Sequence, residues 1–213
     1  MDWVQLNRDF YNSFAAEFSG SRAVINDGIR RTLAALDLSA VLDVGCGDGR
    51  MSGVLPADCR YLGLDFSAKL IGRAALAAPR PFVLADLSHP LPIAPRSFPT
   101  VVCYAVMHHL PGPLRQPLMH SLASVLRPGG KLALSVWRFT HSARMRRKIV
   151  QDLGNNDYLL TWRTGGRSLR YVHQFDDTEI ERLAHQASLS LVDLFYSDGR
   201  SNDLSLYAIF TAR

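Results

Sequence analysis

The feature that most constrains the fold is the stretch 40–49, Ala-Val-Leu-Asp-Val-Gly-Cys-Gly-Asp-Gly. Its first half is apolar and β-favouring, as a central strand buried on both faces requires. Gly45, Gly47 and Gly49 then allow positive φ angles and let a ligand lie against bare backbone at the start of a helix. We therefore predict the first strand and turn of a doubly wound α/β sheet, with a nucleotide-like ligand at the carboxyl edge of its strands.

The spacing of the glycines limits which nucleotide can bind there. A dinucleotide fingerprint has the pattern G-x-G-x-x-G, but here the third glycine comes one residue early and Arg50 stands where the fingerprint has glycine. No Gly-Lys-Ser/Thr follows the turn, as a P-loop would require. The sequence therefore argues against NAD and excludes a P-loop.

Two motifs match a different nucleotide-binding family. The pattern D-x-G-x-G-x-G spans Asp43 to Gly49, and Tyr-Leu-Gly-Leu-Asp-Phe-Ser follows at 61–67. Together they resemble the first two motifs of class I S-adenosylmethionine (SAM) methyltransferases. The resemblance implies a Rossmann-like, seven-stranded, mostly parallel sheet and a ribose contact from Asp65, because a carboxylate accepts hydrogen bonds from two vicinal hydroxyls. The alternative is a glycine turn that serves geometry alone, with Asp65 as a helix N-cap.

The same resemblance implies a cofactor site drawn from several elements. Arg22 is a candidate to pair with the methionine carboxylate of SAM, or it is a solvated arginine in a first helical turn. Asp86 and Leu87 are expected at the adenine amino group, or Asp86 lies in a surface turn. The full set expected to bind SAM is Tyr11, Arg22, Asp43, Gly45, Cys46, Gly47, Gly49, Asp65, Phe66, Ser67, Asp86, Leu87, Tyr104 and Ala105.

The order of predicted elements indicates a single domain over 1–213. Its expected parts are N-terminal lid helices within 1–38 (3–18 and about 22–36), a SAM-binding core over 40–136, a basic insertion on the substrate side over 137–176, and a final helix and strand pair over 177–213. Within and after the core, strands are expected at 60–66, 81–85, 100–105, 131–136, 189–196 and 204–211, and helices at 67–77, 114–126 and 177–187. Arg-Pro-Gly-Gly at 127–130 is expected to stop the helix before it.

The charge distribution points to an anionic partner. The net charge is +5, yet the stretch 137–170 alone holds eight basic residues against two acidic ones. Aromatic residues alternate with these cations, a composition that grips phosphates and stacks bases. The segment is therefore expected to bind an anionic substrate or a phosphate backbone, and the alternative is a mobile, solvated loop.

Other classes of protein are disfavoured by composition. No apolar stretch has the length of a membrane span, and the N-terminus lacks an apolar signal core, so a soluble, cytoplasmic protein without membrane contact is expected. The three cysteines have no C-x-x-C spacing and predict neither a disulfide framework nor a zinc site.

The adjacent His108 and His109 follow the fourth expected strand, at the same edge as the glycine turn. Successive residues point in different directions, so a shared metal ion is not expected at this pair. We expect one histidine to face the substrate as a hydrogen-bond donor or base while the other packs in the following helix, or both to be structural.

A closer resemblance rests on motifs spread over nearly the whole chain. They are Tyr11 with Phe18 to Arg22, the block Ala105 to Leu110, the Arg-Pro-Gly-Gly turn, Val136-Trp137, Gln151-Asp152, Trp162, and the block Arg170 to Phe175. They are similar to the methyltransferases that esterify carboxymethyluridine at the tRNA wobble position, relatives of the methyltransferase domain of an AlkB-type tRNA enzyme. The chain departs from that group's pattern at Asp48, Pro99, Leu160-Thr161, Val172 and Asp203.

This closer resemblance implies O-methylation of a carboxylate on tRNA or on another large anionic substrate. A carboxylate is ionised at neutral pH and needs no general base, only cations that orient it. The expected catalytic residues are His109, Arg170 and His173, and the expected substrate residues are His108, Trp137, Trp162, Arg163 and Arg170. Some members of the group work with a small zinc-binding activator protein, which is therefore a candidate partner.

Two other functions stay open at this level. A small-molecule methyltransferase would act on a carboxylate, phenol or activated carbon, and the basic segment would bind an acidic tail of that metabolite. A SAM-binding regulatory subunit without catalysis is less consistent with Asp43, Asp65 and His109, which all match the catalytic family.

Overall fold

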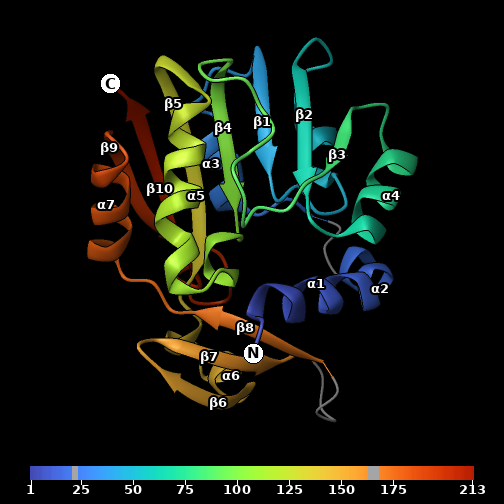
Figure 1. Cartoon of the computed structure of the whole chain (residues 1–213), viewed down its shortest axis with the longest axis vertical. Coiled ribbons are helices and arrows are strands. Elements are labelled where there is room, and N and C mark those ends of the chain that lie inside the picture. The colour runs from blue at the N-terminus through green and yellow to red at the C-terminus, as the bar shows by residue number, and fades with distance from the viewer. Residues whose placement is uncertain (21–23, 163–167) are drawn as a thin grey trace.

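The computed structural model describes residues 1–20, 24–162 and 168–213. Within these residues the chain forms a seven-stranded sheet of order β3-β2-β1-β4-β5-β10-β9 (Figure 1). Its first five strands are parallel, whereas β10 runs antiparallel to both β5 and β9. The strands are β1 (Ala40–Val44), β2 (Arg60–Asp65), β3 (Phe82–Leu84), β4 (Phe98–Tyr104), β5 (Leu126–Trp137), β9 (Leu189–Ser197) and β10 (Ser205–Ala212). The predicted doubly wound, mostly parallel α/β sheet is confirmed.

Helices cover both faces of this sheet because successive apolar side chains of each strand point to opposite sides. Leu42 and Val44 of β1 belong to the core shared with α5 (Gly112–Ser124) and α7 (Asp177–Gln186). Val41 belongs to the opposite core, which contains the apolar residues of α3 (Asp27–Leu33). Figure 1 shows α5 and α7 in front of the sheet and α3 behind it.

The first N-terminal helix is divided in two. It was expected over 3–18 but forms α1 (Trp3–Ser13) and α2 (Ala15–Gly20), which meet at Phe14. The side chain of Asp2 caps α1 by accepting the N–H of Gln5 at 3.0 Å. Both helices lie at the carboxyl edge of the parallel strands, where a lid was expected (Figure 1).

The second N-terminal helix begins later than predicted. It was expected from about 22 to 36, but α3 begins at Asp27 because Asn26 has an extended backbone and its carbonyl already accepts the N–H of Arg30. Its apolar face packs on the sheet. The apolar residues of this helix are therefore part of the core, and Ile29 among them also lines the cavity described below.

The turn at 127–130 is also different from the prediction. Arg-Pro-Gly-Gly does follow a helix, but it lies inside β5, which begins at Leu126 and not at Lys131. The irregular pairing between Phe98 and Thr100 of β4 accommodates it, and Gly129 takes a φ of 72°. The glycines therefore permit a distortion of the strand in addition to ending the helix.

The basic segment after β5 folds into a second, smaller sheet. In the part of the chain that the structure describes, this sheet has three antiparallel strands, β6 (Ile149–Gly154), β7 (Asp157–Thr161) and β8 (Leu169–His173). It lies below the carboxyl edge of the main sheet and beside α1 (Figure 1). The alternative of a solvated loop is therefore excluded for the described residues.

The remaining elements are short. They are the 3₁₀-helices η1 (Arg50–Val54), η2 (Met107–His109) and η3 (Phe139–His141) and the α-helices α4 (Ala68–Ala77) and α6 (Ala143–Arg146). Among the described residues, no helix combines the length and apolar character that a bilayer crossing requires.

Candidate active site

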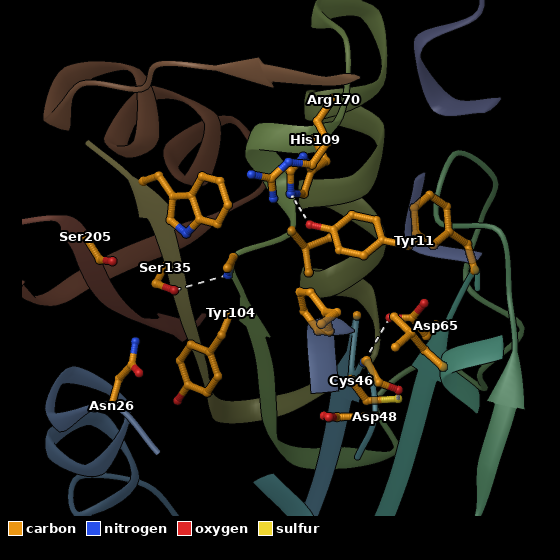
Figure 2. A pocket seen from close by; sticks show the side chains of 18 of the residues that line it. Tyr11, Asn26, Cys46, Asp48, Asp65, Tyr104, His109, Ser135, Arg170 and Ser205 are labelled. Atoms are coloured by element: carbon orange, nitrogen blue, oxygen red, sulfur yellow. Dashed lines mark hydrogen bonds between the residues drawn. The ribbon is translucent and has the colours of Figure 1, made fainter. Parts of the chain in front are cut away.

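A cavity of about 700 Å³ lies at the carboxyl edge of the parallel strands. One side is formed by the turns that follow β1 to β4, and the other by α1, α2, α6 and β8. Figure 2 shows Cys46 and Asp48 on one side and His109 with Arg170 on the opposite side. The volume lies within the range of ordinary small-ligand sites, about 300–1,000 Å³.

The glycine turn after β1 brings bare backbone to this cavity. Gly45 has a φ of 80°, and a Cβ atom there would lie 2.1 Å from Cγ2 of Val106. Gly47 has a φ of 58°, and its N–H donates to Oδ2 of Asp65 at 2.9 Å. Conformation and space therefore both require glycine at position 45.

Asp65 is a buried carboxylate at the end of β2. Its Oδ1 accepts the N–H of Ser67 at 2.8 Å, so its two oxygens are held by backbone donors on either side. Burial raises the pKa of Asp65 to about 6 against the lowering effect of these hydrogen bonds. The N-cap of α4 is Ser67, whose hydroxyl accepts the N–H of Leu70, so the alternative of Asp65 as the N-cap is excluded.

Most of the predicted cofactor residues line the cavity. They are Tyr11, Gly45, Cys46, Gly47, Asp65, Phe66, Asp86, Leu87, Tyr104 and Ala105. Three others support it from behind: Asp43 accepts the hydroxyl of Tyr61 at 2.8 Å, Ser67 caps α4, and Gly49 precedes η1. Burial raises the pKa of Asp43 to about 7. Arg22, in the same predicted set, lies outside the described residues.

Asp86 is paired with a residue that the sequence analysis missed. Its carboxylate forms an ion pair with Arg8 of α1 and accepts the N–H and hydroxyl of Ser88. Although partial burial acts to raise the pKa of Asp86, these hydrogen bonds and the charge of Arg8 hold it below its ordinary value. Arg8 stands three residues before Tyr11 and thus on the same helical face, which is the signal that could have found it.

Tyr11 and His109 form a hydrogen-bonded pair on the other side of the cavity. The Tyr11 hydroxyl lies 2.8 Å from Nε2 of His109, and Nδ1 of His109 lies 3.1 Å from the carbonyl oxygen of Tyr171 (Figure 2). A carbonyl only accepts, so Nδ1 carries a proton and Nε2 faces the tyrosine. Both ring nitrogens of His109 are therefore engaged by protein groups.

Asn7 fixes this pair in place and was also missed from the sequence. The fully buried Asn7 amide donates to the carbonyls of His109 (2.9 Å) and Tyr171 (3.0 Å), and its oxygen accepts the N–H of Tyr171 at 2.9 Å. It thus joins α1, η2 and β8 through three hydrogen bonds. An unpaired backbone group there would be costly, so Asn7 holds the three elements together.

His108 lies behind the cavity wall. Its buried ring stacks on Trp137 with a centroid separation of 4.5 Å, and its Nδ1 accepts the N–H of Trp137 at 3.3 Å. Trp137 lines the cavity, whereas His108 does not. The structure thus places His108 as a support for Trp137, not in the predicted contact with substrate.

Arg170 is a buried cation that pairs with no acidic residue of the described chain. Its guanidinium carbon lies 4.8 Å from the ring centre of Phe10 and 5.1 Å from that of Trp137. Among the described residues no carboxylate forms an ion pair with it, and its Nε has no hydrogen-bond partner. The stretches 21–23 and 163–167 contain no Asp or Glu. Arg170 lines the cavity together with Trp162, and Arg163 lies outside the described residues.

Two further cations on the same side were not singled out from the sequence. Arg144 and Lys148 line the cavity, and Nζ of Lys148 donates to the carbonyl of Trp162 at 3.2 Å. Partial burial lowers the pKa of Lys148, and the charges of Arg170 and Arg144 lower it further. This side of the cavity therefore gathers positive charge.

His173 was predicted to act on the substrate, but the structure places it elsewhere. Its Nδ1 lies 2.6 Å from Asp157, its Nε2 lies 2.8 Å from Glu179, and Arg115 joins both carboxylates. The reason is strand geometry, because residues 170 and 173 of β8 point to opposite faces of the small sheet. His173 is buried, belongs to a partly buried ion-pair network and does not line the cavity.

Comparisons with known proteins agree with this arrangement. A family model described as "Methyltransferase domain" matches residues 42–134. A candidate methyltransferase from Encephalitozoon cuniculi is 33% identical over 86% of this chain and 87% of its own length. The tRNA (carboxymethyluridine(34)-5-O)-methyltransferase of Arabidopsis thaliana is 30% identical over 60% of this chain and 31% of its own length. A ubiquinone biosynthesis O-methyltransferase from Azoarcus is 28% identical over 72% of this chain and 65% of its own length.

Solved structures share the fold. A SAM-dependent methyltransferase from Methanosarcina mazei has a TM-score of 0.72 at 21% identity, over 85% of this chain and 96% of its own. The Haloferax volcanii complex between the Trm112 activator and a methyltransferase gives 0.72 at 17% identity, over 96% of both chains. A Burkholderia thailandensis N1-methyltransferase, solved with 1,6-didemethyltoxoflavin and S-adenosylhomocysteine, gives 0.71 at 18% identity, over 99% of this chain and 89% of its own. With its motifs, its sheet order and a relative matched along most of both chains, this protein belongs to the class I methyltransferases that use S-adenosylmethionine.

Proposed function

We propose that this methyltransferase esterifies a carboxylate on an anionic acceptor, with carboxymethyluridine of tRNA as the leading candidate. The observation that carries the proposal is Arg170, a buried guanidinium that lines the cavity and has no carboxylate partner among the described residues. A buried charge without a partner is costly, so a carboxylate from the acceptor would complete the site.

The cofactor end of the cavity fits SAM. The glycine turn leaves open space beside its backbone. A Cβ atom added at Gly47 would have its nearest neighbour 3.7 Å away, on Phe18. Asp65 is largely ionised at neutral pH and is placed to accept the ribose hydroxyls. Asp86 and Leu87 would lie at the adenine, with Arg8 sharing the carboxylate of Asp86. Arg170 lies on the side of the cavity opposite Cys46 and Asp48 (Figure 2), and that side would hold the acceptor.

The transfer needs little chemistry from the protein. Bound SAM supplies an electrophilic methyl group on a sulfonium sulfur. A carboxylate oxygen of the acceptor forms a bond to that methyl carbon while the carbon–sulfur bond breaks and its electron pair stays on sulfur, giving a methyl ester and S-adenosylhomocysteine. No proton moves, so Arg170 acts by orienting the nucleophile, and Trp137 with Trp162 exclude water.

The Tyr11–His109 pair supports a carboxylate acceptor over a phenol. A phenol needs a base near its hydroxyl, because its ordinary pKa is about 10. His109 has the side chain suited to act as that base, but its two ring nitrogens already face the Tyr11 hydroxyl and the carbonyl of Tyr171. We therefore assign His109 the role of orienting the Tyr11 hydroxyl toward the reacting groups.

The tRNA acceptor is supported by the basic segment and by the Arabidopsis relative. That relative matches only part of its own length, and the Azoarcus relative acts in ubiquinone biosynthesis. A small carboxylate or phenol is therefore the second candidate acceptor. The Haloferax complex with Trm112 supports a small activator protein as a partner, to be supplied in any assay that shows no turnover.

The test is transfer of label from methyl-labelled SAM to tRNA that lacks the wobble ester. We expect label to enter the tRNA and to leave it as methanol in mild alkali, as a methyl ester does. Label that resists alkali would contradict carboxylate transfer. The absence of label, with S-adenosylhomocysteine binding confirmed and an activator present, would contradict the tRNA acceptor and favour a metabolite.

A further inference from the structure

The acceptor side of the cavity holds more positive charge than a single carboxylate would need. Arg170, Lys148 and Arg144 all line it, from β8, the turn before β6, and α6. None of the three forms an ion pair with a carboxylate among the described residues, and the undescribed stretches hold no acidic residue. A carboxylate of the acceptor on Arg170 would leave two of these cations unbalanced.

The acidic residues that line the cavity do not compensate for this charge. Asp48 follows β1, Asp65 ends β2 and Asp86 follows β3, all on the glycine-turn side. Figure 2 shows Asp48 and Asp65 away from Arg170, with Tyr11 and His109 nearer to the arginine. Two of these acids are held by protein donors, Asp65 by backbone N–H groups and Asp86 by Arg8.

Lys148 is held in a position from which its ammonium group could bind an anion inside the cavity. It is half-buried, and its ammonium donates to the carbonyl of Trp162, which leaves two of its three protons for other acceptors. Its pKa is lowered, first by burial and then by Arg170 and Arg144. Like charges gathered without counter-ions destabilise the ligand-free protein, and a bound anion would relieve that repulsion.

We propose that Lys148 and Arg144 form a second anion site, which binds a phosphate group of the same acceptor whose carboxylate lies on Arg170. This inference rests on the proposed function for the carboxylate. It restricts the acceptor to molecules that carry both a carboxylate and a phosphate ester, and so excludes simple carboxylic acids and phenols. The neighbouring Trp162 packs edge-on against Phe10 and Phe14, which fixes its position beside this second site.

The test compares a nucleoside with two derivatives that differ from it only by a phosphate. The affinities of 5-carboxymethyluridine and of its 3′- and 5′-monophosphates would be measured by calorimetry with S-adenosylhomocysteine present. We expect at least one monophosphate to bind about tenfold more tightly than the nucleoside, because a charge-assisted contact contributes about 1.5 kcal/mol or more. Lys148→Gln should abolish this difference and Arg144→Gln should reduce it, with each variant's affinity for the monophosphates compared with its own affinity for the nucleoside.

Arg147→Gln is the matched control. Arg147 follows α6 in the same basic run, but it is exposed and does not line the cavity, so this variant should keep the full preference for the phosphate. Equal affinities of the nucleoside and both monophosphates for the wild-type protein would overturn the second site. So would a preference that Lys148→Gln leaves intact.

A second measurement separates this inference from the proposed function. Inorganic phosphate at millimolar concentration should raise the melting temperature of the wild-type protein and of Arg147→Gln, but not that of Lys148→Gln. If neither nucleoside nor nucleotide binds while phosphate still stabilises in this pattern, the proposed acceptor is wrong and the anion site stands. If phosphate stabilises all three proteins equally, the anion site is wrong whatever the acceptor is.

Discussion

The two ends of the cavity are built in opposite ways. At the glycine-turn end, a carboxylate is held by backbone N–H groups that come from residues close to it in sequence, with Asp65 between Gly47 and Ser67. At the acceptor end, a guanidinium is held between the aromatic rings of Phe10 and Trp137, which come from distant parts of the chain. The acid at the first end is satisfied by the protein alone. At the second end, no carboxylate of the described residues balances the guanidinium, which is the place where the proposed substrate would supply an anion.

The largest expected effect tests the unbalanced cation. Arg170→Gln should lower kcat/KM for the acceptor by about 1,000-fold, since truncating one partner of a buried charge pair costs about 4 kcal/mol. The affinity for S-adenosylhomocysteine should stay within about twofold, because Arg170 lies at the other end of the cavity. Arg170→Lys, which keeps the charge without the planar fork, should recover part of the activity. Steady-state kinetics measures kcat/KM for the acceptor, and calorimetry measures the affinity for S-adenosylhomocysteine. A large loss of S-adenosylhomocysteine binding would contradict the separate roles of the two ends of the cavity.

A smaller effect tests the satisfied acid. Asp65→Ala should weaken S-adenosylhomocysteine binding by about 100-fold, because it removes two hydrogen bonds to an ionised group, each about 1.5 kcal/mol. Asp48→Asn is the matched control, since Asp48 lines the same end and has no resolved role in holding the turn. Calorimetry checks both variants. Equal losses in the two would show that general negative charge, and not the position of Asp65, holds the cofactor.

The pH dependence should separate the cofactor end from the stability of the fold. The pKa of Asp65 is raised to about 6, so its ionised fraction and the affinity for S-adenosylhomocysteine should fall about tenfold between pH 8 and pH 5. The folded state binds this proton more readily than the unfolded state, whose Asp titrates near its ordinary value of 3.8. Asp65 therefore adds stability to the ligand-free protein as the pH falls from about 7 toward 4. Asp65→Asn should flatten the binding curve, and an unchanged curve would assign the titration to another group.

The smallest expected effect on turnover comes from His173, which the structure places outside the cavity. His173→Gln should change kcat by less than about threefold but lower the free energy of unfolding by about 1–2 kcal/mol, because Asp157 and Glu179 lose a partner. Denaturant unfolding and kinetics on the same preparation check this. A loss of activity as large as that of Arg170→Gln would restore His173 to the acceptor site.

The meeting of the glycine turn with Asp65 could be predicted from sequence because its determinants are local. The strand, the glycine turn and Asp65 lie within 43–67, and their spacing alone predicts that they meet at one edge of a parallel sheet. The tertiary structure adds contacts that the sequence did not predict, such as Tyr61 to Asp43 and Arg8 to Asp86. The hairpin of β6 and β7 could also have been predicted. Its turn is formed by Gly154, Asn155 and Asn156, which all have positive φ and are residue types that favour hairpin turns.

The acceptor end could not be predicted in the same way. The basic run contains several cations, and only the fold of α6 and the small sheet decides that Arg144 and Lys148 line the cavity while Arg147 does not. His173 was misplaced because its segment had not been assigned as a strand, whose alternation separates it from Arg170. Asn7 is an ordinary polar residue on a helix until residue 171 is placed beside it.

The hydrogen bonds of Asn7 also set an order of events during synthesis. They join positions 164 residues apart, so they cannot form until β8 has left the ribosome, long after α1 and the glycine turn have emerged. The nascent chain therefore contains its nucleotide-binding turn well before α1 and β8 can form the opposite side of the cavity. The cavity is enclosed on this side only when α1 packs against β8, which is made long after α1.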